Sequence, residues 1–283
     1  MLIAAIRQSQ PVPGVVWSSA GQSINSSYTV KTQRYLERIN VHATGADLAT
    51  LKKLQHHHLL AIPFENLDIY WNRNIVLDIE ASYEKVVING RGGFCYELNG
   101  LFDVLLRDLG FETRLISARV YHADGSTGPE FDHAAVIVMI DGNPYLTDVG
   151  FGDFAAEPLW LVVNEPQEDP AGTFVIRKID ETEFDVAKQV NGDWKGQYVF
   201  TDQSRELSDF TEMCDFQQFS PDSHFKKGPI CSILIKDGRK TLTKAELIIT
   251  WKDSRSASAI ESEDDFYQIL ADQFQIPRPS PQI

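Results

Sequence analysis

The sequence predicts an α+β fold in three parts, because a mainly helical first third is followed by an all-β middle and a mixed last third. The length of 283 residues suits about two domains. Hydrophobic residues make up 43% of the chain and charged residues 23%, which is ordinary globular composition. Wholesale disorder and collagen-like or low-complexity structure are therefore excluded.

The first third is predicted to be helical after a loose start. Residues 1–27 are rich in Ser, Gly, Pro and Gln and show no periodicity, so we expect a loose N-terminal extension there. From Tyr28 onward, apolar residues recur at helical spacing, and Pro63 and Gly110 mark the ends of two helices. The three apolar stripes are Val30, Tyr35, Leu36 and Ile39; Leu48, Leu51, Leu54, His58 and Leu59; and Leu98, Phe102, Leu105, Leu106 and Leu109.

The middle and the end of the chain carry strand patterns. Short apolar runs between Gly, Asp, Asn and Pro predict an antiparallel sheet or barrel, with strands at 113–121, 133–140, 145–149, 174–179 and 197–200. Asp141-Gly142 predicts a tight hairpin, since a type I′ turn needs residues with positive φ. Further on, we expect a hairpin from 230–235 through Asp237-Gly238 to Leu242, a strand at 245–251, and a helix at 262–274 beginning at Ser262.

Charge and cysteine content restrict the partners and the compartment. The formal net charge of −14 argues against a broad grip on nucleic acid, and no apolar run is long enough to span a membrane. The N-terminus is a poor signal peptide, because Arg7 interrupts a short apolar stretch. Three widely spaced cysteines do not form a disulfide framework, so we expect a reducing cytoplasm and neither nucleic-acid nor membrane partners.

Cys95 is the candidate nucleophile. Gly92 and Gly93 precede it directly, and the predicted helix follows, so Cys95 is expected at a helix N-terminus. The unpaired N–H groups and the positive dipole end there stabilise a thiolate. A buried structural cysteine is the alternative, and we assign that role to Cys214 and Cys231.

His133 and Asp148 are the candidate partners of this thiol. The consecutive residues His56, His57 and His58 splay around a helix and predict no metal site. A two-residue turn at Asp141-Gly142 places Asp148 opposite Ala135. His133 lies two residues before Ala135, and side chains along a strand alternate between its two faces with period two. His133 and Asp148 therefore share one face of the sheet. Together with Cys95 they predict a papain- or transglutaminase-like Cys-His-Asp arrangement.

Five spaced motifs resemble the arylamine N-acetyltransferase family, of the bacterial type. They are RGGFCYELN at 91–99, PFENL at 63–67, FDH at 131–133, DVGFG at 148–152 and SPDSHF at 220–225. They occur in the family's order, and the similarity runs from about residue 28 to residue 275. We expect the motif charges of Arg91 and Glu65 to be paired structurally.

The resemblance implies a helical bundle at 28–112, a β-barrel at 113–203 and an α/β lid at 204–283. It implies transfer of an acetyl group from acetyl-CoA, through Cys95, to an arylamine, arylhydrazine or N-hydroxyarylamine, without a metal. By position, the acceptor pocket is formed by Phe64, Val120 and Phe151, and the coenzyme A site by Gly152, Ser220, Ser223, Lys226 and Lys227. The expected partners are coenzyme A and a small aromatic amine or hydrazine, with a monomer or homodimer as the assembly.

Other uses of the same triad stay open at this point. A papain- or transglutaminase-like enzyme would hydrolyse amides, and an amide synthase of the same fold would close a macrocycle from a carrier-bound acyl chain. A relative without catalysis would only bind aromatic molecules, and the complete triad argues against it.

Overall fold

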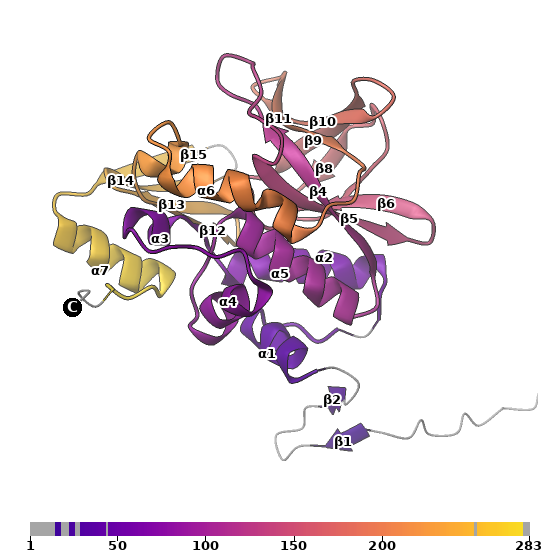
Figure 1. The fold of residues 1–283 in the computed structure, drawn as a ribbon, viewed down its shortest axis with the longest axis horizontal. Helices are drawn as coiled ribbons and strands as arrows, with labels where there is room; N and C mark the ends of the chain where they lie inside the picture. The colour runs from indigo at the N-terminus through magenta and orange to yellow at the C-terminus, as the bar shows by residue number, and fades with distance from the viewer. Residues whose placement is uncertain (1–14, 18–22, 26–28, 44, 252–253, 280–283) are drawn as a thin grey trace, which may run out of the picture.

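The predicted order of helices, sheet and mixed structure is confirmed (Figure 1). The structure, a computed structural model, describes residues 15–17, 23–25, 29–43, 45–251 and 254–279. Within the segment expected to be a loose extension, β1 (Val15–Trp17) pairs antiparallel with β2 (Ser23–Asn25). The rest of residues 1–27 lies outside the described residues. Where the chain is described, no helix is long and apolar enough to cross a membrane.

The three predicted helices are present. They are α1 (Val30–Arg38), α2 (Leu48–Ala61) and α5 (Cys95–Asp108). Asp47 caps α2 by accepting the Thr50 N–H at 2.7 Å, and Gly110, with φ of 92°, follows the end of α5. The sequence pattern did not predict the shorter α3 (Leu67–Tyr70), α4 (Ile79–Tyr83) and the π-helical turn η1 (Glu84–Ile88).

Eight antiparallel strands form the central sheet, in the order β7-β6-β5-β4-β11-β10-β9-β8. The strands are β4 (Glu112–Val120), β5 (His133–Ile140), β6 (Asn143–Thr147), β7 (Leu159–Trp160), β8 (Gln167–Asp169), β9 (Gly172–Lys178), β10 (Glu183–Val190) and β11 (Asp193–Thr201). The two end strands meet: the Gln167 side-chain amide bonds both the N–H and the C=O of Trp160, at 2.8 and 2.7 Å. The sheet is therefore nearly closed into a barrel.

β5 lies between two cores, which explains its unbroken apolar sequence. Ala134, Val136 and Val138 face the helical core with α5, while Ala135 and Ile137 face the barrel interior. Figure 1 shows α5 running beneath β4 and β5. Strands buried on both faces are apolar throughout instead of alternating.

The hairpin after β5 has the predicted register. Ile140 pairs with Asn143, and the turn residues Asp141 and Gly142 have φ of 51° and 77°. β6 ends at Thr147, so Asp148, expected inside the strand, follows directly after its end.

A five-stranded sheet in the order β15-β14-β13-β12-β3 occupies the other side of the molecule. Its strands are β12 (Ile230–Ile235), β13 (Gly238–Thr243), β14 (Glu246–Trp251), β15 (Ser254–Ala259) and β3 (Phe64–Glu65), which belongs to the helical first third. Before it come η2 (Leu207–Phe210), α6 (Thr211–Phe219) and η3 (His224–Lys226), and α7 (Glu263–Phe274) follows it. Ser262 caps α7 as predicted, accepting the Asp265 N–H at 3.0 Å.

The hairpin turn predicted at Asp237-Gly238 was wrong by one position. Ile235 pairs with Gly238, so Lys236 and Asp237 form the turn and Gly238 belongs to β13. A Cβ at position 238 would lie 1.9 Å from the carbonyl oxygen of Thr250. Glycine is therefore needed there for the close approach of β14, and not for the turn.

Candidate active site

Two glycines bring Cys95 against the neighbouring strand. Cys95 is the first residue of α5, and the chain just before it runs beside β3, where the Glu65 N–H donates to the carbonyl of Gly93 at 2.8 Å. A Cβ at Gly92 would lie 2.0 Å from the carbonyl oxygen of Pro63. The Gly-Gly pair thus permits a backbone approach that no other residue allows, and it fixes where α5 begins.

The hairpin brings His133 and Asp148 together, as the parity of the strands predicts. His133 Nε2 lies 2.7 Å from Asp148 Oδ2, and the two residues are 3% and 1% exposed. His133 opens β5, and Asp148 directly follows β6. The first residue of β5 and the residue after β6 are thus joined by a side-chain contact at the open end of the hairpin.

Three further groups donate to the Asp148 carboxylate. Asn99 Nδ2 and the Gly150 N–H donate to Oδ1, both at 2.9 Å, and the Tyr198 hydroxyl donates to Oδ2 at 3.1 Å. Burial and the charge of Asp148 raise the pKa of Tyr198 well above its usual value, so this hydroxyl stays a neutral donor. Burying a carboxylate costs free energy unless donors such as these are hydrogen-bonded to it.

Asn99 and Tyr198 are the site residues that sequence analysis missed. Asn99 lies one turn after Cys95 on α5, so helical spacing alone places the two side chains on one face. Its amide also donates to the Ala134 carbonyl at 2.6 Å and accepts the Val149 N–H at 2.9 Å. Asn99 therefore joins α5 to both strands of the hairpin.

Cys95 lies against this hairpin. The Ala134 N–H hydrogen-bonds the thiol, and a Cβ at Gly150 would be 2.7 Å from the Cys95 Cα. Ala134 directly follows His133 and Gly150 is two residues after Asp148, so the structure brings the three predicted residues to one place.

Burial opposes the Cys95 thiolate that a helix N-terminus favours. Burial raises the pKa of the Cys95 thiol well above its ordinary value, the Ala134 N–H lowers it, and the charges of Asp132 and Asp148 raise it further. Cys95 is only 3% exposed, and this burial is not visible in the sequence. Burial therefore opposes ionisation of this thiol.

The predicted acceptor-pocket residues lie on two sides of this site. The ring of Phe151 is 5.2 Å from that of His133 and 5.3 Å from that of Tyr198, and Val120 pairs with Tyr198 across β4 and β11. Phe64 is buried in β3 beside Gly152, where a Cβ would lie 3.7 Å from its ring. Their role in a pocket stays a prediction.

The predicted coenzyme A residues fall into a loop and one neighbouring segment. Gly152, with φ of 95°, touches Phe64, whose ring is 6.2 Å from that of Phe225 between Ser223 and Lys226. The Ser223 hydroxyl is already engaged, donating to Gln217 at 2.6 Å and accepting the Phe225 N–H at 3.1 Å. Ser220 accepts the Asp222 N–H at 3.2 Å, while Lys226 and Lys227 are exposed.

His58 is the residue of the histidine run that lies in the core. His58 is fully buried, and its Nδ1 lies 2.9 Å from the Tyr35 hydroxyl. Among the described residues, no three His, Cys, Asp or Glu side chains are grouped so that they could hold a metal ion.

Comparison with known proteins identifies the family. A family model described as N-acetyltransferase matches residues 47–282. The chain belongs to this N-acetyltransferase family. This N-acetyltransferase is 35% identical to the arylamine N-acetyltransferase of Escherichia coli K12, over 74% of the chain and 75% of the relative. It is 30% identical to the liver isozyme of Gallus gallus, over 86% of the chain and 94% of the relative.

Solved structures place the fold of this N-acetyltransferase in the same family. The arylamine N-acetyltransferase from Salmonella typhimurium superposes with a TM-score of 0.83 at 29% identity, covering 87% of this chain and 91% of that one. The Mycobacterium marinum arylamine N-acetyltransferase in complex with CoA gives a TM-score of 0.81 at 30% identity, covering 87% and 92%. The resemblance, the fold class and the assignment as an enzyme are confirmed.

Proposed function

We propose that this N-acetyltransferase moves an acetyl group from acetyl-CoA to an arylamine, arylhydrazine or N-hydroxyarylamine through a thioester on Cys95. The observation that carries the proposal is the 2.7 Å contact of His133 with Asp148 beside the start of α5. The family relatives named as arylamine N-acetyltransferases support the substrates, and the relative solved with CoA supports the acyl donor.

In the first half-reaction, His133 accepts the Cys95 proton at Nδ1, because Nε2 faces Asp148. The sulfur attacks the acetyl carbonyl, the bond to the coenzyme sulfur breaks, and His133 returns the proton to that leaving thiolate. Asp148 holds the imidazole in the required tautomer and stabilises its charged form. Since burial favours the neutral thiol, the thiolate forms only as its proton moves to His133.

In the second half-reaction, the amine nitrogen attacks the thioester carbon and loses its proton to His133. The bond between carbon and the Cys95 sulfur breaks, and His133 then reprotonates the thiolate. Aromatic side chains of Phe64 and Phe151, with Val120, offer apolar surface on which a flat acceptor can stack. Gly152 and the segment carrying Ser220, Ser223, Lys226 and Lys227 are proposed for the coenzyme, with the exposed lysines as the groups available to its phosphates.

A reducing cytoplasm is the proposed compartment. Cys95, Cys214 and Cys231 are all free thiols, and a nucleophilic thiol must stay reduced to react.

Intact-protein mass spectrometry tests the reaction. Acetyl-CoA alone should add one acetyl group to the wild type and none to Cys95→Ser, since a hydroxyl ionises far less than a thiol. Cys231→Ala, a buried cysteine in β12, is the matched control and should be acetylated like the wild type. An arylamine should discharge the label faster than water does, with parallel double-reciprocal plots.

Three outcomes would contradict the proposal. Intersecting plots without a trappable acetyl-enzyme would indicate direct transfer in a ternary complex. Rapid discharge to water without an amine would favour the papain- or transglutaminase-like hydrolase, and acylation only by a carrier-bound chain would favour the amide synthase.

A further inference from the structure

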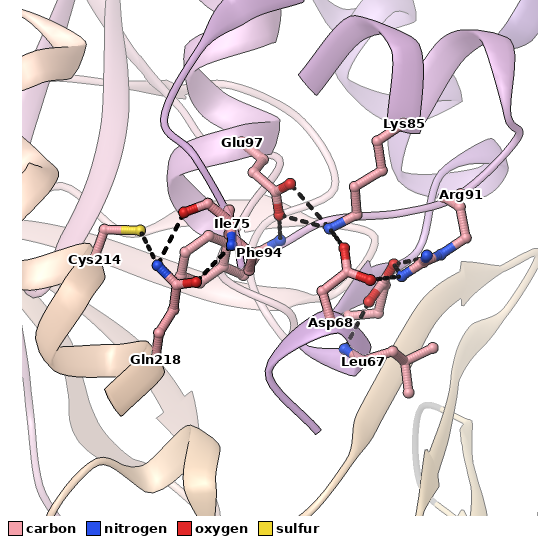
Figure 2. A network of polar contacts seen from close by, with 10 residues as sticks. Leu67, Asp68, Ile75, Lys85, Arg91, Phe94, Glu97, Cys214 and Gln218 are labelled. Carbon is pink, nitrogen blue, oxygen red and sulfur yellow. Dashed lines mark hydrogen bonds and ion pairs between the residues drawn. The ribbon is translucent and has the colours of Figure 1, made fainter. Parts of the chain in front are cut away.

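A buried cluster of five charged side chains lies beside the chain that leads into α5. Figure 2 shows Asp68, Lys85, Arg91 and Glu97 in this cluster. Its carboxylates are Glu65, Asp68 and Glu97, and its cations are Lys85 and Arg91. As expected, Arg91 is paired with Glu65, through Nη2 at 2.6 Å and Nε at 3.0 Å. These side chains are at most 13% exposed. With three acids and two bases, the cluster carries a formal charge of −1.

Glu97 connects this cluster to the backbone that precedes Cys95. Its carboxylate accepts the N–H of Phe94, the residue before Cys95, at 3.1 Å. It also lies against Gly93, where a Cβ would be 3.0 Å from Oε2. An ionised carboxylate at the first turn of a helix stabilises that turn through the exposed N–H groups. The position of Cys95 therefore depends on Glu97.

Lys85 is the cation that balances Glu97. Its Nζ lies 2.9 Å from both Glu97 oxygens and 2.8 Å from Asp68 Oδ2, as Figure 2 shows. Burial opposes the charge on Lys85, but Glu97, Glu65 and Asp68 raise its pKa above the usual value. Burial raises the pKa of Glu97, and the charge of Lys85 opposes that rise. Lys85 therefore offsets part of the effect of burial on Glu97.

The location of Lys85 suits a role at the site. It belongs to η1, a π-helical turn, and such turns occur frequently at functional sites. The backbone of the same turn holds the cysteine segment, because the Lys85 carbonyl accepts the Arg91 N–H at 3.1 Å. The two charges also act in opposite directions on a nearby thiol. The pKa of Cys214 is raised to about 12, with burial and the charge of Glu97 raising it and Lys85 lowering it.

We propose that Lys85 is a positioning residue that acts on Cys95 through Glu97: the pair holds the first turn of α5 and sets the charge at the turn that carries the reactive thiol. The proposal rests on the proposed function only in taking Cys95 as that thiol. Removing Lys85 changes the charge of the cluster from −1 to −2, and removing the charge of Glu97 changes it to zero. Removing both restores −1, and a glutamine at position 97 still offers an oxygen to the Phe94 N–H.

The test is the pH dependence of Cys95 alkylation by iodoacetamide, since the thiolate is the species that reacts. Intact mass follows the rate, and peptide mapping assigns the label to Cys95. Lys85→Met should shift the profile to higher pH and slow labelling at pH 7 about tenfold, and Glu97→Gln should shift it to lower pH. The double variant Lys85→Met/Glu97→Gln should lie within about threefold of the wild type.

A purely structural role of the two residues does not predict opposite shifts of the pH profile in the single variants that cancel in the double variant. Loss of packing alone would slow both single variants and slow the double variant most, and that pattern would overturn the proposal. A wild-type profile for Glu97→Gln would overturn it even if Lys85→Met fails to fold. The control is Lys52→Met, which removes the exposed Lys52–Glu157 ion pair of 2.6 Å and should leave the profile unchanged.

Alkylation and acetylation of Cys95 are measured separately, so failure of this proposal can be distinguished from failure of the proposed function. If the wild type is alkylated normally but forms no acetyl-enzyme with acetyl-CoA, the proposed function fails while the charge pattern can still hold. If acetylation occurs and the two single variants shift in the same direction, the role of Lys85 fails and the proposed function stands.

Discussion

At the scale of single residues, the Asp148 carboxylate receives donors on both of its oxygens. Asn99 and the Gly150 N–H approach Oδ1, while His133 and Tyr198 approach Oδ2. An asparagine at this position must turn its NH₂ group toward one of these pairs of donors. No orientation of the amide therefore preserves all four contacts.

We predict that Asp148→Asn slows acetyl-enzyme formation by about a hundredfold or more, because the imidazole loses its orienting acceptor. Tyr198→Phe removes one donor of four and should slow it by less than about tenfold. Rapid-quench mass spectrometry with acetyl-CoA measures both rates. Equal losses in the two variants, or a near-wild-type rate for Asp148→Asn, would be inconsistent with this account.

Part of the geometry of this site can be predicted from the sequence. The pairing of His133 with Asp148 follows from a turn signal and the period of a strand. The donors from Asn99 and Tyr198 do not, because they depend on how α5 and β11 pack against the hairpin. The pKa of Cys95 is hidden for the same reason: a helix N-terminus is visible in a sequence, whereas burial of the thiol is not.

At the scale of elements, α5 and the loop after β6 meet at Gly150. A Cβ there would lie 2.7 Å from both the Cys95 Cα and Asn99 Nδ2. One contact is helix backbone, so relief requires the loop and the helix to move apart. The absence of a side chain at Gly150 thus sets the distance between α5 and the loop after β6.

We predict that Gly150→Ala slows acetyl-enzyme formation at least about tenfold and lowers the free energy of unfolding by about 1–3 kcal/mol, because overpacking shifts the backbone. Urea unfolding and the acetylation rate measure the two effects. Gly228→Ala is the control, since a Cβ there meets nothing within 4 Å. A stable, fully active Gly150→Ala variant would show that the contact does not set the spacing.

The charge content of β10 explains why the sequence did not predict this strand. β10 carries Glu183, Asp185 and Lys188, and this charge content hides its alternation. The structure shows Asp185 buried and bonded to Arg177 directly opposite on β9. A cross-strand ion pair allows a charged residue to occupy a core position, but only the fold identifies the partner.

At the scale of the whole molecule, the helical core contains a histidine without charge. His58 packs at 5.3 Å from the ring of Phe102, and burial together with the charge of Arg38 lowers its pKa to about 3. An unfolded chain protonates this imidazole near pH 6.5, but the folded chain does not. Stability from this group is therefore complete above that pH and is lost as the pH falls toward 3.

We predict that His58 alone lowers the free energy of unfolding by about 2 kcal/mol between pH 7.5 and pH 5. His58→Gln, which keeps an acceptor for the Tyr35 hydroxyl, should remove this part of the pH dependence. Urea unfolding at both pH values measures it, with the exposed His42→Gln as control. Identical pH dependence in His58→Gln and the wild type would show that His58 is not buried neutral.

The contact between the two end strands of the barrel affects whether copies of this chain associate. An end strand with unpaired N–H and C=O groups is a template on which a strand from another molecule can add. Gln167 uses its amide to bind β7 across the seam, so the barrel does not present such a template there. In the described part of the C-terminal sheet, β15 remains as an outer strand, and all six of its residues are exposed. Loss of the Gln167 amide would free the end strands β7 and β8 in an otherwise folded protein, and we expect association that increases with protein concentration.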